Sequence, residues 1–389
     1  MSTALVRDRF ALFAFRIEAT PGVDPIAGSP IASDFQPGEG DFEYNPTIIA
    51  NPEHTGTLDR APGIPGGLRP RIKLRVALRG SGVAATPPDF SPLLQCCAMA
   101  LTTTAAAVGV PTAATAGTIS TATAAAPFVA TANAYVGMPL SVTGDQVFNT
   151  GIISYSAARL IGMGEVRAAA LTTSSMLQVP INHRYAPTSD ESVYKTGVFY
   201  VYKDGYRWVF TGCVGTWSLE MNTGGMCFIN FDFTGQLASV ALAALPSGLG
   251  NLTIRPVAAT FIAGKSRLNL AVARVRRLMF DAGVETTLPD NPEAAQGYDP
   301  GVPIARAMGG SMDPLMDTAG GTSITDAFRT GTNVPIMAMV GSTVGNRFVV
   351  VAPAARLVDV RHPARDGLLG NEIKFACDGP DAGLYLCAF

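Results

Sequence analysis

The segment from Val198 to Gly235 reads VFYVYKDGYRWVFTGCVGTWSLEMNTGGMCFINFDFTG and carries the clearest structural signal in the chain. Two runs of aromatic and β-branched residues flank Asp204-Gly205. This dipeptide is typical of a type I′ turn, because both central residues of that turn have φ above zero. Two further runs, Gly215–Met221 and Met226–Thr234, follow, and the last mostly alternates. The segment therefore predicts an antiparallel hairpin followed by two more strands.

A similar pattern recurs near the end of the sequence, in residues 336 to 379. The core of the match aligns Gly205–Phe210 (GYRWVF) with Gly345–Val350 (GNRFVV). Later positions also correspond, with about two extra residues in the second copy, namely Gly225 with Gly367, Phe233 with Phe375 or Cys377, and Gly235 with Gly379. A loop accepts such a length difference easily, so the pattern indicates an internal duplication.

The composition limits the class of protein. The chain has 389 residues, of which 15% are charged and 48% are hydrophobic, and its formal net charge is −2. This balance excludes a broadly basic nucleic-acid binder, although it allows a local patch. The mean hydropathy is +0.25, yet no apolar run approaches the roughly 20 residues of a membrane span. Low charge without a membrane segment predicts either extensive contact with other protein surfaces or a surface rich in small Thr, Ser and Ala side chains.

The cysteines favour a reducing compartment. None of the six lies in a Cys-x-x-Cys pair, and adjacent Cys96-Cys97 suits neither zinc nor an ordinary disulfide. The first residues, MSTALVRDRFALFAF, contain Asp8 and are a poor match to a signal peptide. We therefore expect folding in the cytoplasm, with the thiols acting as small buried apolar groups; they are Cys96, Cys97, Cys213, Cys227, Cys377 and Cys387.

The first hundred residues combine turns with one strong strand. The stretch 18–25 (EATPGVDP) is typical of a loop or arm, and Phe35–Tyr44 could form a strand. Residues 71–79 (RIKLRVALR) alternate strictly, which predicts an antiparallel strand with a basic outer face. That face indicates either a solvated edge protected by charge or a strand beside an acidic neighbour. In residues 91–100 (SPLLQCCAMA) we expect a short helix capped by Ser91, with Pro92 at its first position.

The chain then changes character. Residues 101–134 are mostly Ala, Thr and Gly, and several short strand-like runs follow up to residue 185. We interpret 101–187 as an inserted small β domain on the outside of the fold. The predicted fold is therefore mainly β, with antiparallel sheets packed as a β-sandwich and with short helices. One repeat unit comprises 1–100 with 188–245, and the second comprises 246–389, including a short helix near Thr325–Arg329.

One motif invites a nucleotide-binding interpretation. Ala259–Ser266 (ATFIAGKS) satisfies a permissive phosphate-loop pattern. Such a loop must be flexible and must lead into a helix whose N-terminus faces the anion. Here the loop is bulky, and the following SRLNLAVARV favours a strand as much as a helix. We therefore expect a plain hairpin turn at Gly264-Lys265.

No other pattern predicts chemistry. His54, His183 and His362 stand alone in loop-like contexts, without a second ligand at helical or hairpin spacing. The aromatic residues could form a carbohydrate or base platform, but alternating spacing on paired strands favours sheet packing; they are Trp208, Trp217, Tyr200, Tyr202 and Tyr206. We predict no catalytic, cofactor-binding or metal-binding residues, no cofactor, and no enzymatic activity.

The chain resembles the tail tube (major tail) proteins of long-tailed, non-contractile bacteriophages, or siphophages. The resemblance rests on structural motifs and spans most of the chain outside 101–187. It lies in EATPGVDP at 18–25, KLRVALRGSG at 73–82, SPLLQCCAMA at 91–100, residues 185–235, GNRFVVVAPAARL at 345–357 and DGLLGNEIKF at 366–375. The inserted segment is similar to small Gly-rich β modules that decorate tail proteins.

The resemblance implies a virion protein that assembles in the host cytoplasm into a tube of sixfold character. Two tube-like halves in one chain imply homotrimeric rings with pseudo-sixfold symmetry. The implied partners are other copies of the chain, the tape-measure protein and DNA in the lumen, and the tail terminator and distal tail proteins at the ends, with no membrane. Because cationic contacts bind DNA, we expect a lumen with few Lys or Arg and some Asp or Glu.

Three other functions remain open from the sequence. The chain could be another tail component, such as a distal tail or terminator protein. The 101–187 insertion could be a surface glycan-binding module. Gly264-Lys265-Ser266 could belong to a nucleotide-binding enzyme.

Overall fold

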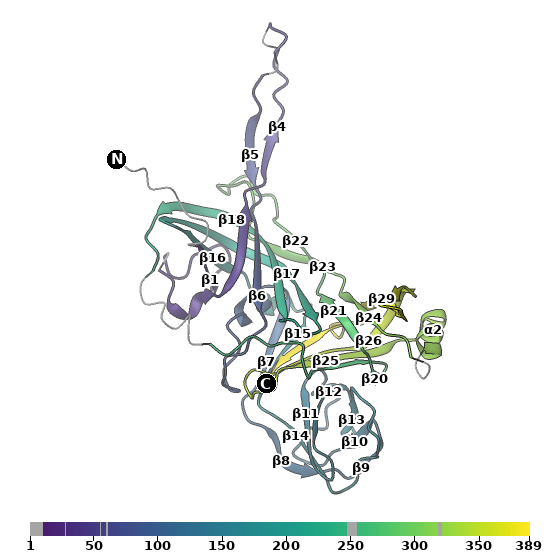
Figure 1. The fold of residues 1–389 in the computed structure, drawn as a ribbon. Coiled ribbons are helices and arrows are strands. Elements are labelled where there is room, and N and C mark those ends of the chain that lie inside the picture. The colour runs from purple at the N-terminus through teal and green to yellow at the C-terminus, as the bar shows by residue number, and fades with distance from the viewer. Residues whose placement is uncertain (1–10, 28, 55, 60, 247–254, 318–320) are drawn as a thin grey trace.

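The structure is a computed structural model that describes residues 11–27, 29–54, 56–59, 61–246, 255–317 and 321–389 (Figure 1). Residues 247–254 of the expected second unit and the first ten residues of the N-terminal segment lie outside these ranges. The described strands form one 17-stranded sheet, one seven-stranded sheet and three two-stranded sheets, all from antiparallel ladders. The expectation of a mainly β fold is confirmed.

The first group of strands in the large sheet contains the predicted hairpin. It pairs in the order β2 (Phe35–Gln36), β1 (Ala11–Ile17), β16 (Gly197–Lys203), β17 (Tyr206–Asn222), β18 (Phe228–Leu242), β6 (Arg71–Ala77) and β3 (Gly38–Glu43). Asp204 and Gly205 form a two-residue turn between β16 and β17, with φ of +32° and +97°. The predicted type of turn is confirmed, because both residues lie in the left-handed region.

β17 and β18 are longer than the sequence indicates. The predicted runs at 206–210 and 215–221 belong to one strand of 17 residues, because the ladder with β18 continues across two register shifts. One shift lies between Thr211 and Val214, beside Gly212, whose φ is +61°. A Cβ on Gly212 would lie 2.8 Å from Pro300, so glycine allows both the turn of the backbone and the close approach. The N-terminal part of β17 pairs with β16, whereas its C-terminal part pairs with a strand from the other half of the chain.

The second group of strands repeats the pairing order of the first. It runs β20 (Ala271–Val272), β19 (Lys265–Leu268), β25 (Val334–Val340), β26 (Phe348–Arg361), β29 (Glu372–Cys377), β24 (Gly309–Pro314) and β21 (Val275–Asp281). The order along the chain also corresponds. In the first group, β1, β2, β3 and β6 come before β16, β17 and β18. In the second group, β19, β20, β21 and β24 come before β25, β26 and β29.

Hairpins and helices occupy matching places in the two groups. The β4 (Pro46–Ile49) and β5 (Ile64–Leu68) hairpin separates β3 from β6, as β22 (Val284–Thr287) and β23 (Val302–Arg306) separate β21 from β24. Figure 1 shows the β4–β5 hairpin projecting from the body. Helix α1 (Ser91–Gln95) follows β6, and α2 (Gly321–Thr330) follows β24.

Two local expectations need correction. The N-cap of α1 is Phe90 rather than Ser91, and Pro92 is the second helical residue, because the backbone before Ser91 is already turning at Pro88. The expected hairpin turn at Gly264-Lys265 is also wrong. Lys265 begins β19, and the turn lies at Asn269 and Leu270, where φ is +49° and +68°.

The N-terminal stretch expected to be a loose arm is anchored by one carboxylate. Glu18 is 6% exposed and accepts hydrogen bonds from the Gly22 and Gly212 N–H groups, each at 2.8 Å, and from the Thr196 hydroxyl at 2.6 Å. It therefore ties residues 18–22 to the bend of β17. The short 3₁₀ turns η1 (Ala32–Asp34) and η2 (Glu191–Val193) precede β2 and β16.

The inserted segment forms the separate seven-stranded sheet. Its strands pair in the order β8 (Val108–Ala113), β14 (Ser175–Val179), β11 (Pro139–Gly144), β12 (Phe148–Tyr155), β13 (Leu160–Met163), β10 (Thr121–Thr123) and β9 (Ala116–Gly117). The flanking strands β7 (Met99–Thr104) and β15 (Asn182–Pro187) pair with each other in the large sheet, where β15 also pairs with β30 (Tyr385–Ala388). A last small hairpin, β27 (Ala364–Arg365) and β28 (Leu368–Leu369), lies between β26 and β29.

The main core lies between the layers of the large sheet and joins both strand groups. It includes Trp217, Phe231 and Phe233 from the first group and Phe280 and Phe375 from the second, all less than 4% exposed. All six cysteines are free and buried, which confirms their expected role as small apolar groups. The aromatic residues Trp217, Tyr200 and Tyr202 are buried as well, which confirms sheet packing at these positions.

Candidate assembly surfaces

The most extensive candidate surface is a ribbon of strands that runs through both halves of the chain. Its order is β3–β6–β18–β17–β21–β24–β29–β26, and each neighbouring pair is antiparallel. The two strand groups meet in its middle, where Ser218–Asn222 of β17 pairs with Asp281–Arg277 of β21. Eight strands therefore form one continuous surface.

The two faces of this ribbon differ sharply. On β6, the predicted apolar side chains Ile72, Leu74 and Val76 are at most 3% exposed and face the core. The alternating Arg71, Lys73 and Arg75 lie on the opposite face and are exposed. Trp217, Phe231, Phe280 and Phe375 continue the apolar face along the ribbon, so the solvated face is the polar one.

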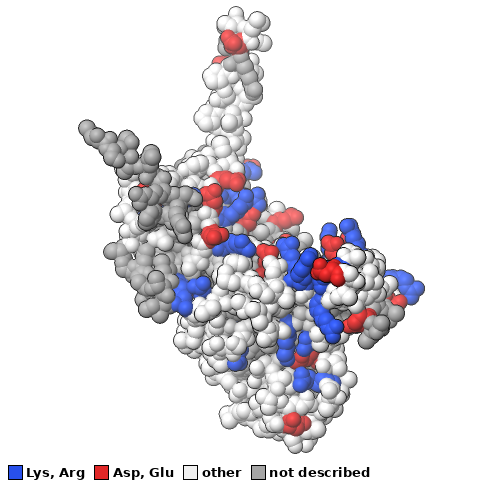
Figure 2. Space-filling model, viewed as in Figure 1, with Lys and Arg blue, Asp and Glu red and all other residues white. Residues whose placement is uncertain are grey.

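The basic residues of β6 meet acidic neighbours. Arg71 pairs with Asp232 of β18, Lys73 with Glu43 of β3 at 3.3 Å, and Arg75 with Glu220 of β17 at 3.7 Å. The interpretation of β6 as an edge strand is wrong, because it is paired on both sides, and the alternative of an acidic neighbour is confirmed. Figure 2 shows charged side chains gathered in a band from the base of the β4–β5 hairpin toward α2.

A shallow hollow of about 610 Å³ lies on the polar face of the ribbon. Residues of neighbouring strands line it, among them Gly40, Ser218 and Asn230. At its border the Lys203 ammonium hydrogen bonds to Asp41 at 2.9 Å and thereby lowers the pKa of that carboxyl. The surface is therefore concave and bears both signs of charge.

The two outer strands of the ribbon differ in charge. β3 reads GEGDFE, and within the described residues it pairs only with β6 along its length. At the other end, β26 and the strand β27 that follows it carry Arg356, Arg361 and Arg365 against one carboxylate, Asp359. One end is thus acidic and the other basic.

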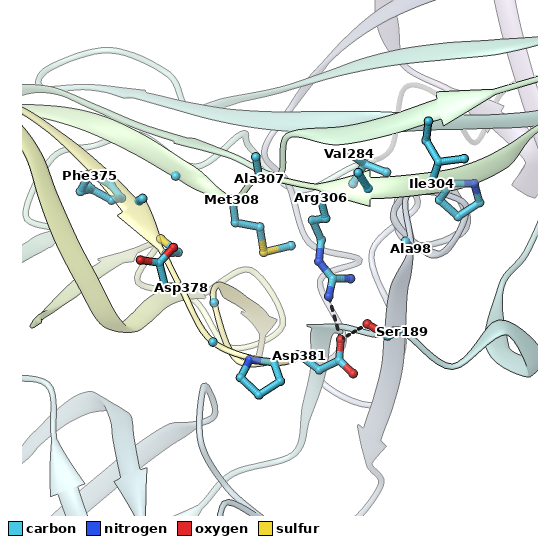
Figure 3. Close-up of a pocket in the computed structure, with 18 of the residues that line it drawn as sticks. Ala98, Ser189, Val284, Ile304, Arg306, Ala307, Met308, Phe375, Asp378 and Asp381 are labelled. Atoms are coloured by element: carbon cyan, nitrogen blue, oxygen red, sulfur yellow. Dashed lines mark hydrogen bonds and ion pairs between the residues drawn. The ribbon is translucent and has the colours of Figure 1, made fainter.

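A second hollow, of about 540 Å³, lies where the β22–β23 hairpin approaches the loop before β30 (Figure 3). Arg306 of β23 points toward that loop, donating to Asp381 at 2.7 Å and to the Thr188 carbonyl at 2.9 Å, and Ser189 also donates to Asp381. Burial raises the pKa of Asp381, but the hydrogen bonds from Ser189 and Arg306 outweigh it and lower that pKa. The polar groups satisfy one another, so this hollow has the features of a structural junction.

The phosphate-loop-like residues serve a structural contact. The Lys265 ammonium donates to the Asn149 carbonyl at 2.6 Å and to Glu165, both in the insertion. Burial lowers the pKa of Lys265, and the Glu165 hydrogen bond opposes that shift. A strand follows Lys265 in place of the helix that a phosphate loop requires, and Ser266 is buried in that strand.

The histidines lie apart from one another. His183 lies on β15, not in a loop as expected, and its Nδ1 is 3.1 Å from the Thr103 hydroxyl oxygen. His362 Nδ1 is 2.7 Å from Asn371 Oδ1, and His54 is exposed. Within the described ranges, no cluster of His, Cys, Asp or Glu could hold a metal ion. In those same ranges, neither helix has the length and apolar character needed to traverse a lipid bilayer.

Sequence reasoning missed Glu18 and Glu165, the two carboxylates that fix the N-terminal segment and the insertion. Each stands alone in its local sequence, and its partners are remote in the chain, so only a pairing signal between distant positions could have indicated them.

Comparison with known proteins agrees with this strand-rich architecture. No curated protein matches the chain. A family model described as "Phage tail tube protein" matches residues 11–372, which is nearly the whole chain. The match includes the first strand group, the insertion and every strand of the ribbon except β29, of which it reaches only Glu372. This chain therefore belongs to the phage tail tube protein family.

Proposed function

We propose that the chain forms the tail tube of a siphophage as stacked homotrimeric rings with pseudo-sixfold symmetry. Membership of the family establishes a structural role in a phage tail and self-assembly into a tube. The observation that supports trimers is the repeated pairing order, in which β3–β6–β18–β17 has its counterpart in β21–β24–β29–β26. Three chains, each with two such units, supply six equivalent wall elements.

Strand geometry gives the size of the resulting tube. Three ribbons of eight strands would make a closed barrel of 24 strands. At about 4.8 Å per strand and a tilt of about 40°, such a barrel is about 48 Å across between backbones. Closure also removes the exposed strand edges at the two ends of each ribbon.

In this arrangement the polar face of the ribbon lines the lumen, and the domain cores lie outside it. The face carries more Lys and Arg than the few we expect in a DNA conduit. Their charges are offset by acids on adjacent strands, as in Arg71–Asp232, Lys73–Glu43 and Arg277–Glu220. A cation that already has a carboxylate partner releases fewer counterions from DNA, so such a lumen lets DNA slide through it.

The proposal has the same division into parts that the sequence suggests. Residues 1–100 with 188–245 and residues 246–389 form the two wall units, and 101–187 is an external insertion. The lumen holds DNA and the tape-measure protein, and the tail terminator and distal tail proteins close the ends. Assembly takes place in the host cytoplasm, and the chain has no enzymatic activity.

Electron microscopy of the purified full-length chain tests this proposal. We expect hollow tubes whose cross-section averages show three copies in each ring, with six similar wall elements. Averages with six copies per ring would contradict the trimer. Compact monomers under every condition tried would contradict tube formation by this chain alone.

A further inference from the structure

The contact between β17 and β21 joins the two strand groups within one chain. In the second group, β26 followed by β27 corresponds to β17. β21 pairs with the C-terminal part of β17, but within the described residues no strand pairs with the outer edge of the corresponding part of β26 and β27. In the first group, the counterpart of β21 is β3, whose outer edge is open in the described residues. The single chain therefore contains one such junction and the two separate halves of a second.

The strand registers define which residues correspond. Glu43↔Arg71 and Phe42↔Ile72 at the end of β3 match Asp281↔Gly309 and Phe280↔Gly310 at the end of β21. Ile72 and Gly310 in turn pair with Phe233 and Phe375. From the same ladders, Ser218, opposite Asn230, corresponds to Arg361, opposite Glu372. Because Ser218 pairs with Asp281, the corresponding pair is Arg361 with Glu43.

The backbone of the β26–β27 edge is oriented for this contact. In the existing junction, Thr223 N–H donates to the Arg276 carbonyl at 2.8 Å, and Ala282 N–H donates to the Trp217 carbonyl at 3.0 Å. Alternate residues of β17 therefore point their main-chain groups toward β21. The corresponding residues on the β26–β27 edge of the same chain include 362 and 364. Pro363 lies between them and accepts from Gly370 N–H within its own hairpin, so its missing N–H removes no outward donor.

The β3 edge also has a main-chain group without a strand partner. Phe42 N–H donates to the Asp41 carboxylate at 2.9 Å in an exposed setting. In the corresponding junction position, the main chain of Phe280 faces Leu219 of β17. A strand placed beside β3 would give Phe42 N–H a backbone acceptor.

Charge favours the same register. Arg361 would lie opposite Glu43. Arg365 would lie opposite Glu39, but it already pairs with Asp313 at 3.2 Å, so the charge argument rests on Arg361. Arg361 is 67% exposed on its side chain, and Glu43 is 55% exposed. Arg361 at present pairs with Asp359, and Glu43 pairs with Lys73. Both are surface ion pairs, which contribute little to stability and can rearrange. Opposite charges directly across two strands stabilise their pairing.

We infer that residues 361–365 at the end of β26 and in β27 pair antiparallel with residues 43–39 of β3 in a second copy of this chain. Glu43 lies opposite Arg361 and Phe42 opposite His362. This inference rests on the proposed function, since it supplies the contact by which one ring subunit joins the next. The contact is heterologous, and its repetition closes a ring when the rotation per subunit allows it.

A paired cysteine variant tests the register. In Glu43→Cys/Arg361→Cys the two positions form a pair that is not hydrogen-bonded, with Cα atoms about 4.5 Å apart, which suits a disulfide. We expect mild oxidation of assembled tubes to give covalent oligomers on non-reducing gels. The control is Glu39→Cys/Arg361→Cys, in which the cysteines are about 13 Å apart along the strand and should not cross-link. Burial raises the pKa of Cys227 and of Cys377 to about 12, and all six native thiols are buried, so background cross-linking is low.

The outcomes separate the inference from the proposed function. Cross-linking that stops at three chains supports both, whereas cross-linking that continues to six supports the strand pairing and contradicts the trimer. Tubes without cross-linking, or with equal cross-linking of the control, would overturn the strand pairing and leave the tube intact.

A charge exchange covers the case in which the cysteine variants fail to assemble. Arg361→Glu should reduce the number of tubes while the monomer keeps its circular dichroism and melting temperature, because it places like charges opposite each other, and adding Glu43→Arg should restore the tubes. Unchanged assembly of Arg361→Glu, or no rescue by the double variant, would contradict the contact.

Discussion

Glu165 joins the insertion to the second strand group through a buried charge cluster. Its side chain is 1% exposed, and it accepts from Arg267 at 2.7 Å and from Lys265, while Arg167 lies 3.9 Å away. Three cations thus surround one carboxylate that is withdrawn from water. Such a group is stabilising only while its partners are in place, because a buried charge without a counter-charge is costly.

Replacing this carboxylate should therefore destabilise the chain. We expect Glu165→Gln to lower the free energy of unfolding by about 3 kcal/mol, because it leaves Lys265 and Arg267 close together without a counter-charge. Urea denaturation followed by circular dichroism measures the change. The matched control is Glu293→Gln, at an exposed position, which should change stability by less than about 0.5 kcal/mol. Equal effects of the two substitutions would show that the cluster contributes nothing specific.

At the level of elements, the long β17–β18 hairpin organises the first half of the chain. β17 pairs with β16, β18 and β21, and β18 pairs with β17 and β6. The turn before β17 sets the register of β16 against it, so a distortion there is transmitted to strands on both sides. Glycine is required at this turn by its backbone conformation and not by crowding, because a Cβ on Gly205 would meet no atom within 4 Å.

Substitution at the turn should thus isolate backbone strain. Gly205→Ala should lower stability by about 1 kcal/mol, since φ of +97° is unfavourable for any residue with a Cβ. Thermal unfolding of the variant measures this loss. Gly225→Ala is the control, because Gly225 lies in the turn at the other end of β17, lacks a positive φ, and has no contact closer than 3.4 Å to its added Cβ. If alanine changed stability equally at Gly205 and Gly225, the Asp204-Gly205 turn would have adopted a different turn type without strain.

At the scale of the whole molecule, the insertion is packed against the wall and not merely tethered to it. Gly151 of β12 lies so close to β25 and β26 that a Cβ there would be 2.8 Å from Val351 and 3.1 Å from Met337. Met337, Val349 and Val351 are at most 1% exposed under this contact. Meanwhile β7 and β15 bring Thr104 and Asn182 opposite each other, so the two ends of the insertion are adjacent.

This geometry predicts the result of removing the insertion. Replacing 105–181 by an Asn-Gly turn should preserve the β7–β15 ladder but expose the apolar patch of Met337, Val349 and Val351, so the shortened chain should aggregate or melt at lower temperature. Adding Met337→Thr and Val351→Thr should restore solubility. Light scattering and tube counts by electron microscopy provide the measurement. Full stability of the simple deletion would show that the insertion contributes nothing to the wall.

Much of the strand content was predictable, because it depends on local pattern. The Asp204-Gly205 turn, the alternation of Ile72, Leu74 and Val76 and the buried cysteines follow from residue type and periodicity alone. The misplaced features depend on neighbours distant in sequence. The sequence of β6 alone is typical of a charged edge strand, but in the structure β3 and β18 pair with it on both sides. The sequence at Gly264-Lys265 is typical of a turn, but Lys265 lies in β19, which pairs with β25.

The candidate surface was less predictable than the strands that compose it. Sequence reasoning could assign each strand an apolar and a polar face, but it could not join eight strands into one ribbon. That joining depends on the β17–β21 ladder, which connects residues about sixty positions apart and has no local signature. The acidic edge of β3 and the basic edge of β26 are complementary surfaces only because they lie at opposite ends of that ribbon.

The sequence by itself determined the fold class, the first hairpin with its turn, the absence of a recognisable catalytic motif and the resemblance to tail tube proteins, since these follow from short-range periodicity and turn chemistry. Only the tertiary structure decided that β17 pairs with strands of both groups on either side of its bend at Gly212, that Glu18 and Glu165 fix remote segments, and which edges are left open. The physical reason is that strand pairing and charge burial are fixed by long-range contacts, whose energies depend on the assembled environment and not on neighbouring residues.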